Sequence, residues 1–194
     1  MIGQPESKSK LKAFLQEYRQ EIKFVIIFSV GVVASFFVVN NETISNAIFK
    51  PVTVAETFLA SIVLNWIGYP NSHSGTFILG EAGNPFRMEV INNCNGVYES
   101  TLFLMAFIAL QVPWRRKIGW MFFGLVLFYS INELRLINLF IVGSEYSNKT
   151  FVFFHETFWN FGLVIFSLAI FIFCAHSLTK NNPIPPTYTE AESK

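Results

Sequence analysis

The amino-acid sequence predicts an all-α polytopic membrane protein with four to five transmembrane helices, an interfacial or re-entrant amphipathic helix and a small extracytoplasmic β-hairpin. Two observations carry this prediction. Of the 194 residues, 52% are hydrophobic and the mean hydropathy is +0.43, while only 14% are charged, against roughly 25% in soluble domains. The few basic residues gather beside long uncharged stretches, as they do next to membrane spans.

The first span is expected at residues 24–39. The preceding residues 1–23 are polar, and they include five basic residues, Lys8, Lys10, Lys12, Arg19 and Lys23. Because basic residues favour the cytoplasmic side of a membrane, this N-terminal segment is expected in the cytoplasm. The apolar run begins late and no small-residue cleavage site follows it, so we expect a retained anchor rather than a signal peptide.

Residues 51–68 predict an amphipathic helix, because apolar side chains alternate at helical spacing with Thr53, Glu56, Thr57, Ser61 and Asn65. We expect this helix to lie in the interface or to re-enter the membrane. A full crossing would place the following loop in the cytoplasm, in conflict with the positions of the basic residues further along the chain.

Residues 70–93 are expected to form an extracytoplasmic loop. Short strands at 76–79 and 86–91 flank the turn signal Ala82-Gly83-Asn84-Pro85, which predicts a small β-hairpin. The second strand leads into the polar string Asn92-Asn93-Cys94-Asn95-Gly96.

Three further apolar segments follow, at 97–112, 118–142 and 151–178. The loop after the first of them contains three consecutive basic residues, Arg115, Arg116 and Lys117, which mark a second cytoplasmic position. Residues 24–178 therefore form a single membrane-embedded domain, followed by a cytoplasmic tail at 179–194 that is expected to be disordered.

Three reactive side chains are expected at one depth. A helix rises about 1.5 Å per residue, so Cys94 lies about 31 Å, Arg135 about 27 Å and His155 about 37 Å from the nearest basic residue on the cytoplasmic side. The hydrocarbon core is about 30 Å thick, which places all three near the outer face. Together they offer a nucleophile, a cation for an oxyanion or substrate carboxylate, and a general base or acid.

Cys94 and His155 each have a plainer alternative. Most cysteines in a membrane chain are structural, as Cys174 in its apolar helix is expected to be, and Cys174 is too far from Cys94 for a disulfide. The polar setting of Cys94 and its place before a helix N-terminus, which favours a thiolate, indicate a reactive role. His73 in the outer loop is the competing base, whereas depth excludes His176.

Arg135 interrupts an apolar span, and ionisable residues in spans are costly enough to be functional candidates. The alternatives are a snorkelling arginine or a structural pair with Glu133. A pair with Glu99 or with a substrate is equally open. Asn132, about one turn earlier, could orient the guanidinium.

The string Cys94-Asn95-Gly96, followed by Asn132-x-x-Arg135 and by His155 at the start of the last span, resembles the exosortase/archaeosortase family of membrane transpeptidases over roughly residues 52–178. The Cys-Asn-Gly form is similar to the H-type exosortases. The chain has fewer spans than many members, and Tyr98 displaces the acidic residue to Glu99. The resemblance implies the catalytic set Cys94, Arg135 and His155, with Asn95, Glu99 and Asn132 as substrate-binding or supporting residues, and neither a metal nor another cofactor.

This resemblance implies an intramembrane cysteine protease or transpeptidase of the bacterial inner membrane. It would cleave C-terminal sorting signals of exported proteins on the periplasmic side, through a thioester on Cys94. Its substrates would carry a short motif, a transmembrane helix and a basic cluster, and lipids would be its other partners. The net charge of +1 gives no reason to expect nucleic acid.

Two other classes of protein remain as alternatives. One is a non-enzymatic transporter or scaffold, in which Arg135 and Glu133 form a structural pair and Cys94 is dispensable. The other is a thiol-dependent acyltransferase on the cytoplasmic side, which the expected depth of Cys94 disfavours. A metal hydrolase is disfavoured because the sequence has no His-x-x-x-His and no clustered Cys/His spacing.

Overall fold

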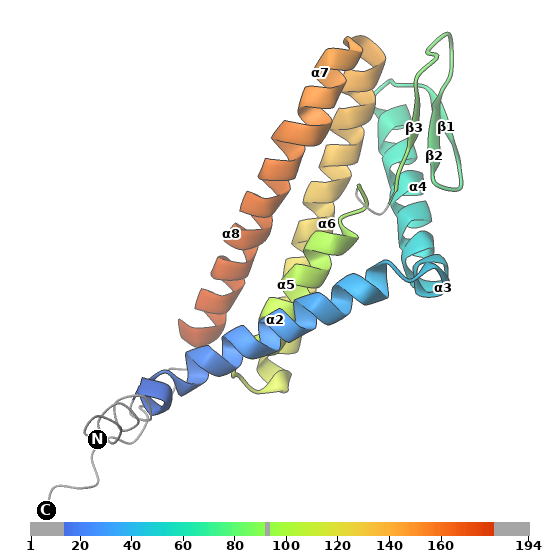
Figure 1. Ribbon diagram of the computed structural model, residues 1–194. Helices are drawn as coiled ribbons and strands as arrows, with labels where there is room; N and C mark the ends of the chain where they lie inside the picture. The colour runs from blue at the N-terminus through green and yellow to red at the C-terminus, as the bar shows by residue number, and fades with distance from the viewer. Residues whose placement is uncertain (1–13, 92–93, 181–194) are drawn as a thin grey trace, which may run out of the picture.

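The protein is mostly helical, with a small antiparallel sheet at one end (Figure 1). The structure, a computed structural model, describes residues 14–91 and 94–180. Of the tail at 179–194 that was predicted to be disordered, residues 179–180 belong to the last helix, and residues 181–194 lie outside the described part. Within the described residues, four helical segments are long and apolar enough to cross a membrane: Arg19–Val39, Glu42–Trp66, Trp114–Glu145 and Asn148–Leu178. The predicted class of all-α polytopic membrane protein is thus confirmed.

The predicted third span is shorter than expected. Helix α5 (Val97–Ala109) has 13 residues, which corresponds to about 20 Å, less than a hydrocarbon core of about 30 Å. It ends because Leu110 adopts an extended backbone conformation shortly before Pro113, which cannot continue a helix. Helix α2 (Arg19–Val39) packs along α5.

The segment predicted to be interfacial or re-entrant is part of a longer helical stretch, composed of α3 (Glu42–Ile44), the π-helical η1 (Ser45–Phe49) and α4 (Lys50–Trp66). Its polar face points inward: the buried residues of α4 include Thr53, Glu56, Thr57 and Ser61, whereas Phe58, Leu59 and Ile62 are exposed. An interfacial helix would turn its polar face to water. In α4 the polar face is buried in the protein, and the apolar face is the exposed one.

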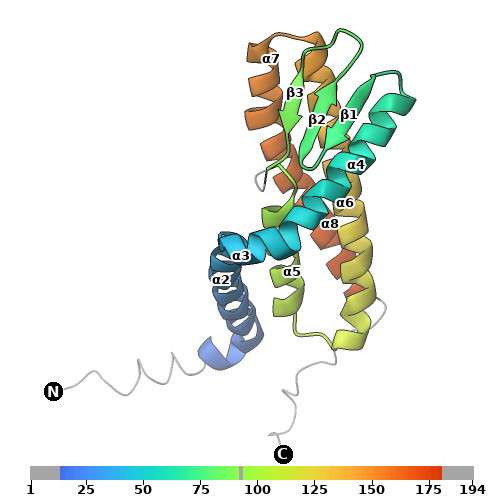
Figure 2. The same ribbon diagram turned by 90° about the vertical axis from the view of Figure 1, so that its right-hand side faces the viewer.

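A helix long enough to cross the membrane at residues 51–68 was expected to conflict with the positions of the basic residues. The fold avoids this conflict. Helix α4 leads away from α2 toward the sheet, instead of folding back beside α2 (Figures 1 and 2). It therefore carries the chain further from the end where α2 begins. The loop that follows α4 therefore lies at the end of the molecule away from the start of α2, although the whole helical stretch Glu42–Trp66 has the length of a span.

The sheet contains β1 (Asn71–Ser74), β2 (Phe77–Gly80) and β3 (Arg87–Glu89), in that order and antiparallel. Strands β2 and β3 form the predicted hairpin. Strand β1 was not predicted, because its sequence Asn-Ser-His-Ser lacks the β-branched and aromatic residues typical of strands. It is anchored to α4 instead, since Ser61 donates a hydrogen bond to Asn71 (2.6 Å).

Two long antiparallel helices complete the fold. Helix α6 (Trp114–Glu145) has 32 residues, about 48 Å, and extends well beyond the thickness of a hydrocarbon core. The chain returns through α7 (Asn148–Val152), the π-helical η2 (Phe153–Phe158) and α8 (Trp159–Lys180), which form one continuous rod packed against α6.

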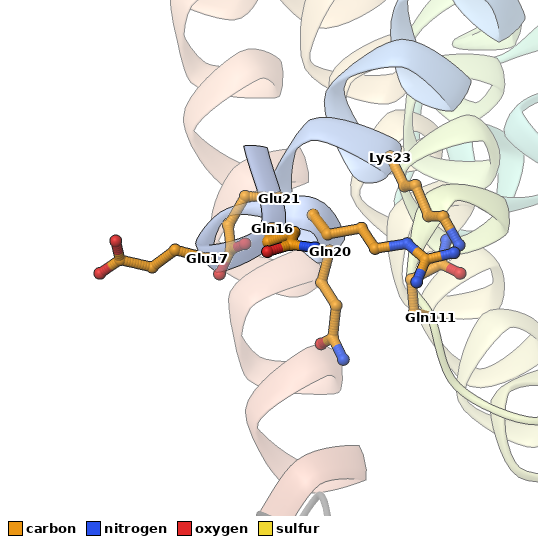
Figure 3. Close-up of a pocket in the computed structure, with 7 residues that line it drawn as sticks. Gln16, Glu17, Gln20, Glu21, Lys23 and Gln111 are labelled. Atoms are coloured by element: carbon orange, nitrogen blue, oxygen red, sulfur yellow. The ribbon is translucent and has the colours of Figure 1, made fainter. Parts of the chain in front are cut away.

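The positions predicted to be cytoplasmic lie together. The start of α2, the loop between α5 and α6, and the end of α8 are all at the end of the molecule opposite the sheet (Figures 1 and 2). Figure 3 shows charged and amide side chains of α2 beside Gln111 from that loop, around a hollow of about 510 Å³ that Glu17, Glu21 and Lys23 also line. The three positions expected on one side of the membrane therefore share one end of the molecule.

Candidate active site

Cys94 and His155, 61 residues apart in the chain, lie in contact: the distance from Cys94 Sγ to His155 Nε2 is 3.1 Å. Cys94 comes shortly before α5 and is 7% exposed. His155 lies in η2, and its ring stacks on Phe151 with centroids 5.7 Å apart. The competing base, His73, packs against Phe58 instead. A thiol and an imidazole at this distance can exchange a proton.

A tight turn presents the cysteine. The backbone N–H groups of Cys94 and Asn95 both donate to the carbonyl of Ile91, at 2.7 and 3.0 Å. Gly96 has φ +67°, and a Cβ added there would lie 2.8 Å from Phe128 Cε1. Glycine is needed at this position because it accepts a left-handed backbone and lets the turn approach α6 closely.

Asn95 anchors the same turn to two helices. Its Nδ2 donates to Thr53 Oγ1 of α4 (2.7 Å), and its Oδ1 accepts from the backbone N–H of Val97 at the start of α5 (3.1 Å). The side chain is fully buried. Of the two roles predicted for Asn95, these contacts fit the supporting one.

The sequence suggested that Asn132 orients Arg135. In the structure, the hydrogen bonds of the Asn132 side chain go to other residues. Its Nδ2 donates to Glu56 Oε1 (2.9 Å) and to the backbone carbonyl of Cys94 (3.3 Å). Asn132 therefore holds the nucleophile's backbone. The spacing of three residues placed Asn132 and Arg135 on one side of α6, but it could not show that the amide has closer partners from α4 and from the turn.

Arg135 is fully buried on α6, and two of its three guanidinium nitrogens donate no hydrogen bond to the described residues. Nη2 donates to Asn160 Oδ1 (3.4 Å), whereas Nε and Nη1 have no hydrogen-bond partner within the described residues. In the same part of the chain no ion pair joins Arg135 to Glu133 or Glu99. A structural role for Arg135 would rest on an ion pair with Glu133, and that pair is not formed. A buried cation without such a partner lowers stability, so the purely structural interpretation of Arg135 is disfavoured.

The comparison with known families decides the identity of the chain. The family model described as "Transmembrane exosortase" matches residues 20–175. The chain belongs to the transmembrane exosortase family. Comparisons with curated proteins and with solved structures gave no match. The matched range includes every residue of the site, so the family relationship and the geometry of the exosortase concern the same part of the chain.

Glu99 of the exosortase lies in a different environment from the one predicted. It lines a groove of about 380 Å³ between α2, α5 and α8, together with apolar side chains that include Phe24, Phe28 and Leu168. The groove is apolar apart from this carboxylate and Ser167. The pair of Glu99 with Arg135, one of the alternatives that the sequence left open, is not formed among the described residues.

Burial sets the protonation of the exosortase's cysteine. Burial raises the pKa of the Cys94 thiol, and the positive charge of Arg135 opposes this rise only in part. The helix N-terminus was expected to favour a thiolate, whereas burial of the thiol acts in the opposite direction. The resting thiol is therefore neutral, and the thiolate has to form by proton transfer to His155.

Three residues at the exosortase's site were missing from the sequence-based set: Thr53, Glu56 and Asn160. The first two lie on the polar face of the amphipathic segment, which was expected to be interfacial or re-entrant and which the structure turns inward. Asn160 is a single amide between Trp159 and Phe161, and nothing in its spacing connects it to Arg135. The signal that could have found Thr53 and Glu56 is the regular recurrence of polar residues on one face of an otherwise apolar helix.

Proposed function

We propose that this exosortase is an intramembrane cysteine peptidase or transpeptidase that removes C-terminal sorting signals from exported proteins at the outer face of the inner membrane. The observation that carries the proposal is the 3.1 Å contact between the Cys94 sulfur and the His155 ring, in a site that also contains a buried arginine with open donors. Membership of the family supports a sorting protease or transpeptidase in general terms.

In the first half of the reaction, His155 accepts the Cys94 proton while the sulfur attacks the scissile carbonyl carbon. The carbonyl oxygen becomes an oxyanion, and the open N–H groups of Arg135 stabilise it. When the tetrahedral intermediate collapses, the C–N bond breaks and His155 returns its proton to the leaving amine. The sorting signal departs with a new amino terminus, and the exported protein remains on Cys94 as a thioester.

In the second half, an amine or a water molecule attacks the thioester carbonyl, and His155 takes the proton of that nucleophile. The S–C bond breaks, and the proton passes from His155 to the sulfur, which restores the thiol. An amine gives a transpeptidation product, whereas water gives hydrolysis. The same two side chains serve both halves, so their mutual distance matters twice.

The proposal is tested by mass spectrometry of exported proteins that end in a motif, a transmembrane helix and a basic cluster. In cells that contain the exosortase, these proteins are expected to end at one defined residue upstream of the helix. In cells that lack it, the full C-terminal tail should remain. Identical C-termini in both kinds of cell would contradict the proposal.

The outer-face location has its own support. Arg135 lies 21 residues after Trp114 in α6, about 32 Å from the end that carries the basic loop. That distance is close to the thickness of a hydrocarbon core, so the site lies near the boundary on the side of the sheet.

This topology predicts a difference between two introduced cysteines, in a protein without Cys94 and Cys174. Glu81→Cys, in the exposed turn after β2, is expected to react with a membrane-impermeant maleimide in intact cells. Gln111→Cys, exposed at the opposite end, should react only after permeabilisation. Labelling of Gln111→Cys in intact cells would show that the orientation is reversed.

A further inference from the structure

Glu56 is a carboxylate in the interior of the protein that the mechanism above does not use. It is 5% exposed, on the inward face of α4. Its Oε1 accepts a hydrogen bond from Asn132 (2.9 Å), and its Oε2 has no hydrogen-bond partner within the described residues. A buried carboxylic group with an incomplete set of partners lowers stability, so its presence calls for a reason other than stability.

Asn132 connects this carboxylate to the nucleophile through a single nitrogen atom. An amide NH₂ group has two hydrogens, and here one goes to Glu56 and the other to the backbone carbonyl of Cys94 (3.3 Å). Both partners accept, which requires the nitrogen rather than the oxygen of the amide to face them. Asn132 Oδ1 has no partner among the described residues, so the two hydrogen bonds from Nδ2, to Glu56 and to Cys94, restrain the amide's orientation.

Helix α4 also holds the other side of the turn. Thr53, three residues before Glu56, accepts the hydrogen bond from Asn95 (2.7 Å). The backbone of Cys94 and the side chain of Asn95 are thus fixed from the same buried face, while His155 approaches from η2. The Sγ to Nε2 distance depends on where this turn sits relative to α6 and η2.

We propose that Glu56 is a positioning residue for the nucleophile. It accepts a hydrogen bond from the Asn132 amide and so holds this amide where it also donates to the Cys94 carbonyl. The turn is thereby fixed with the sulfur within proton-transfer distance of His155. Without this acceptor the amide keeps only its hydrogen bond to the Cys94 carbonyl, so Asn132 and the turn that it holds can shift relative to His155. The inference rests on the proposed function and adds α4 to the active site.

The test compares Glu56→Gln, which keeps an acceptor oxygen, with Glu56→Leu, which fills the space without one. The matched control is Ser61→Ala, on the same buried face of α4 but bonded to Asn71 rather than to the turn. Two rates are measured in a Cys174→Ala background: removal of the tail from one exported protein, and alkylation of Cys94 by iodoacetamide in isolated membranes at neutral pH.

Glu56→Leu is expected to slow tail removal by about 10- to 100-fold, since small displacements of reacting groups cost this much. It should also slow alkylation, because the sulfur loses its base. Both rates of Glu56→Gln should stay within about threefold of those of the unchanged protein. The rates of the Ser61→Ala control should equal those of the unchanged protein. A Glu56→Leu variant with unchanged rates would overturn the proposal, and so would a Glu56→Gln variant as slow as Glu56→Leu.

Asn132→Asp tests the same connection in a side chain of nearly identical shape, which guards against a Glu56→Leu variant that does not fold. It replaces both donated hydrogens by an acceptor oxygen, so it should lose at least as much activity as Glu56→Leu. Combining Glu56→Leu with Asn132→Ala should add less than about twofold to the loss from Asn132→Ala alone, since both changes break one chain of contacts. Full additivity would contradict the role of Asn132 as the link. Intact tails with the unchanged protein would refute the proposed function, whereas the alkylation rates still test the positioning.

Discussion

Replacement of Cys94 by alanine is expected to reduce removal of C-terminal sorting signals by at least about 10⁴-fold, because the reaction loses the atom on which the thioester forms. The sulfur is the partner of His155 at 3.1 Å, and alanine leaves that imidazole without a nucleophile to activate. The measurement is a pulse-chase of one exported protein, with mass spectrometry of its C-terminus. The uncleaved form should persist throughout the chase.

The matched control is Cys174→Ala. Cys174 is also free and buried, but it packs with Phe103 and Phe107 in the cluster that lies toward the end of α8. Loss of its sulfur should cost about 1 kcal/mol of packing and leave the processing rate unchanged. Normal processing by Cys94→Ala, with the protein inserted at normal levels, would favour the alternative of a non-enzymatic transporter or scaffold.

Residue counts were sufficient to predict Cys94 and His155 at one depth. Each lies near the end of an apolar segment whose other end is marked by basic residues, and helical rise converts residue counts into depth. Depth alone leaves the lateral positions of the segments open. The contact of 3.1 Å follows from the packing of η2 against the turn before α5, which no residue count contains.

The inward face of α4 shows where sequence reasoning reaches its limit. An amphipathic pattern establishes that one side of a helix is polar, but it does not say whether that side meets water or the polar interior of a helical bundle. The partner of Glu56 is Asn132, 76 positions away in the chain, and it becomes visible only when α4 and α6 are placed side by side. The sequence predicted an interfacial or re-entrant amphipathic helix here, and the structure adds that the polar face of this helix is buried within the protein.

His155→Ala is expected to reduce tail removal by about 10³-fold, within the range of general acid and base catalysis. The residual activity should depend on pH differently from that of the unchanged protein. Burial raises the pKa of the Cys94 thiol, so without His155 little thiolate exists at neutral pH, and its fraction grows as the pH rises toward that raised pKa. The rate of Cys94 alkylation in His155→Ala membranes should accordingly be low at neutral pH and rise as the pH is raised. The unchanged protein should already be alkylated at neutral pH.

The control for this pH profile is His73→Ala, which removes the other outer histidine and its contact with Phe58. It should leave both the rate and the profile unchanged, because the His73 ring packs against α4 and does not contact the thiol. If His73→Ala reduced tail removal and His155→Ala did not, the base would be His73 on β1 rather than His155 in η2. If neither change moved the profile, proton transfer from Cys94 would not pass through a histidine, and the double use of His155 in acylation and release would fail with it.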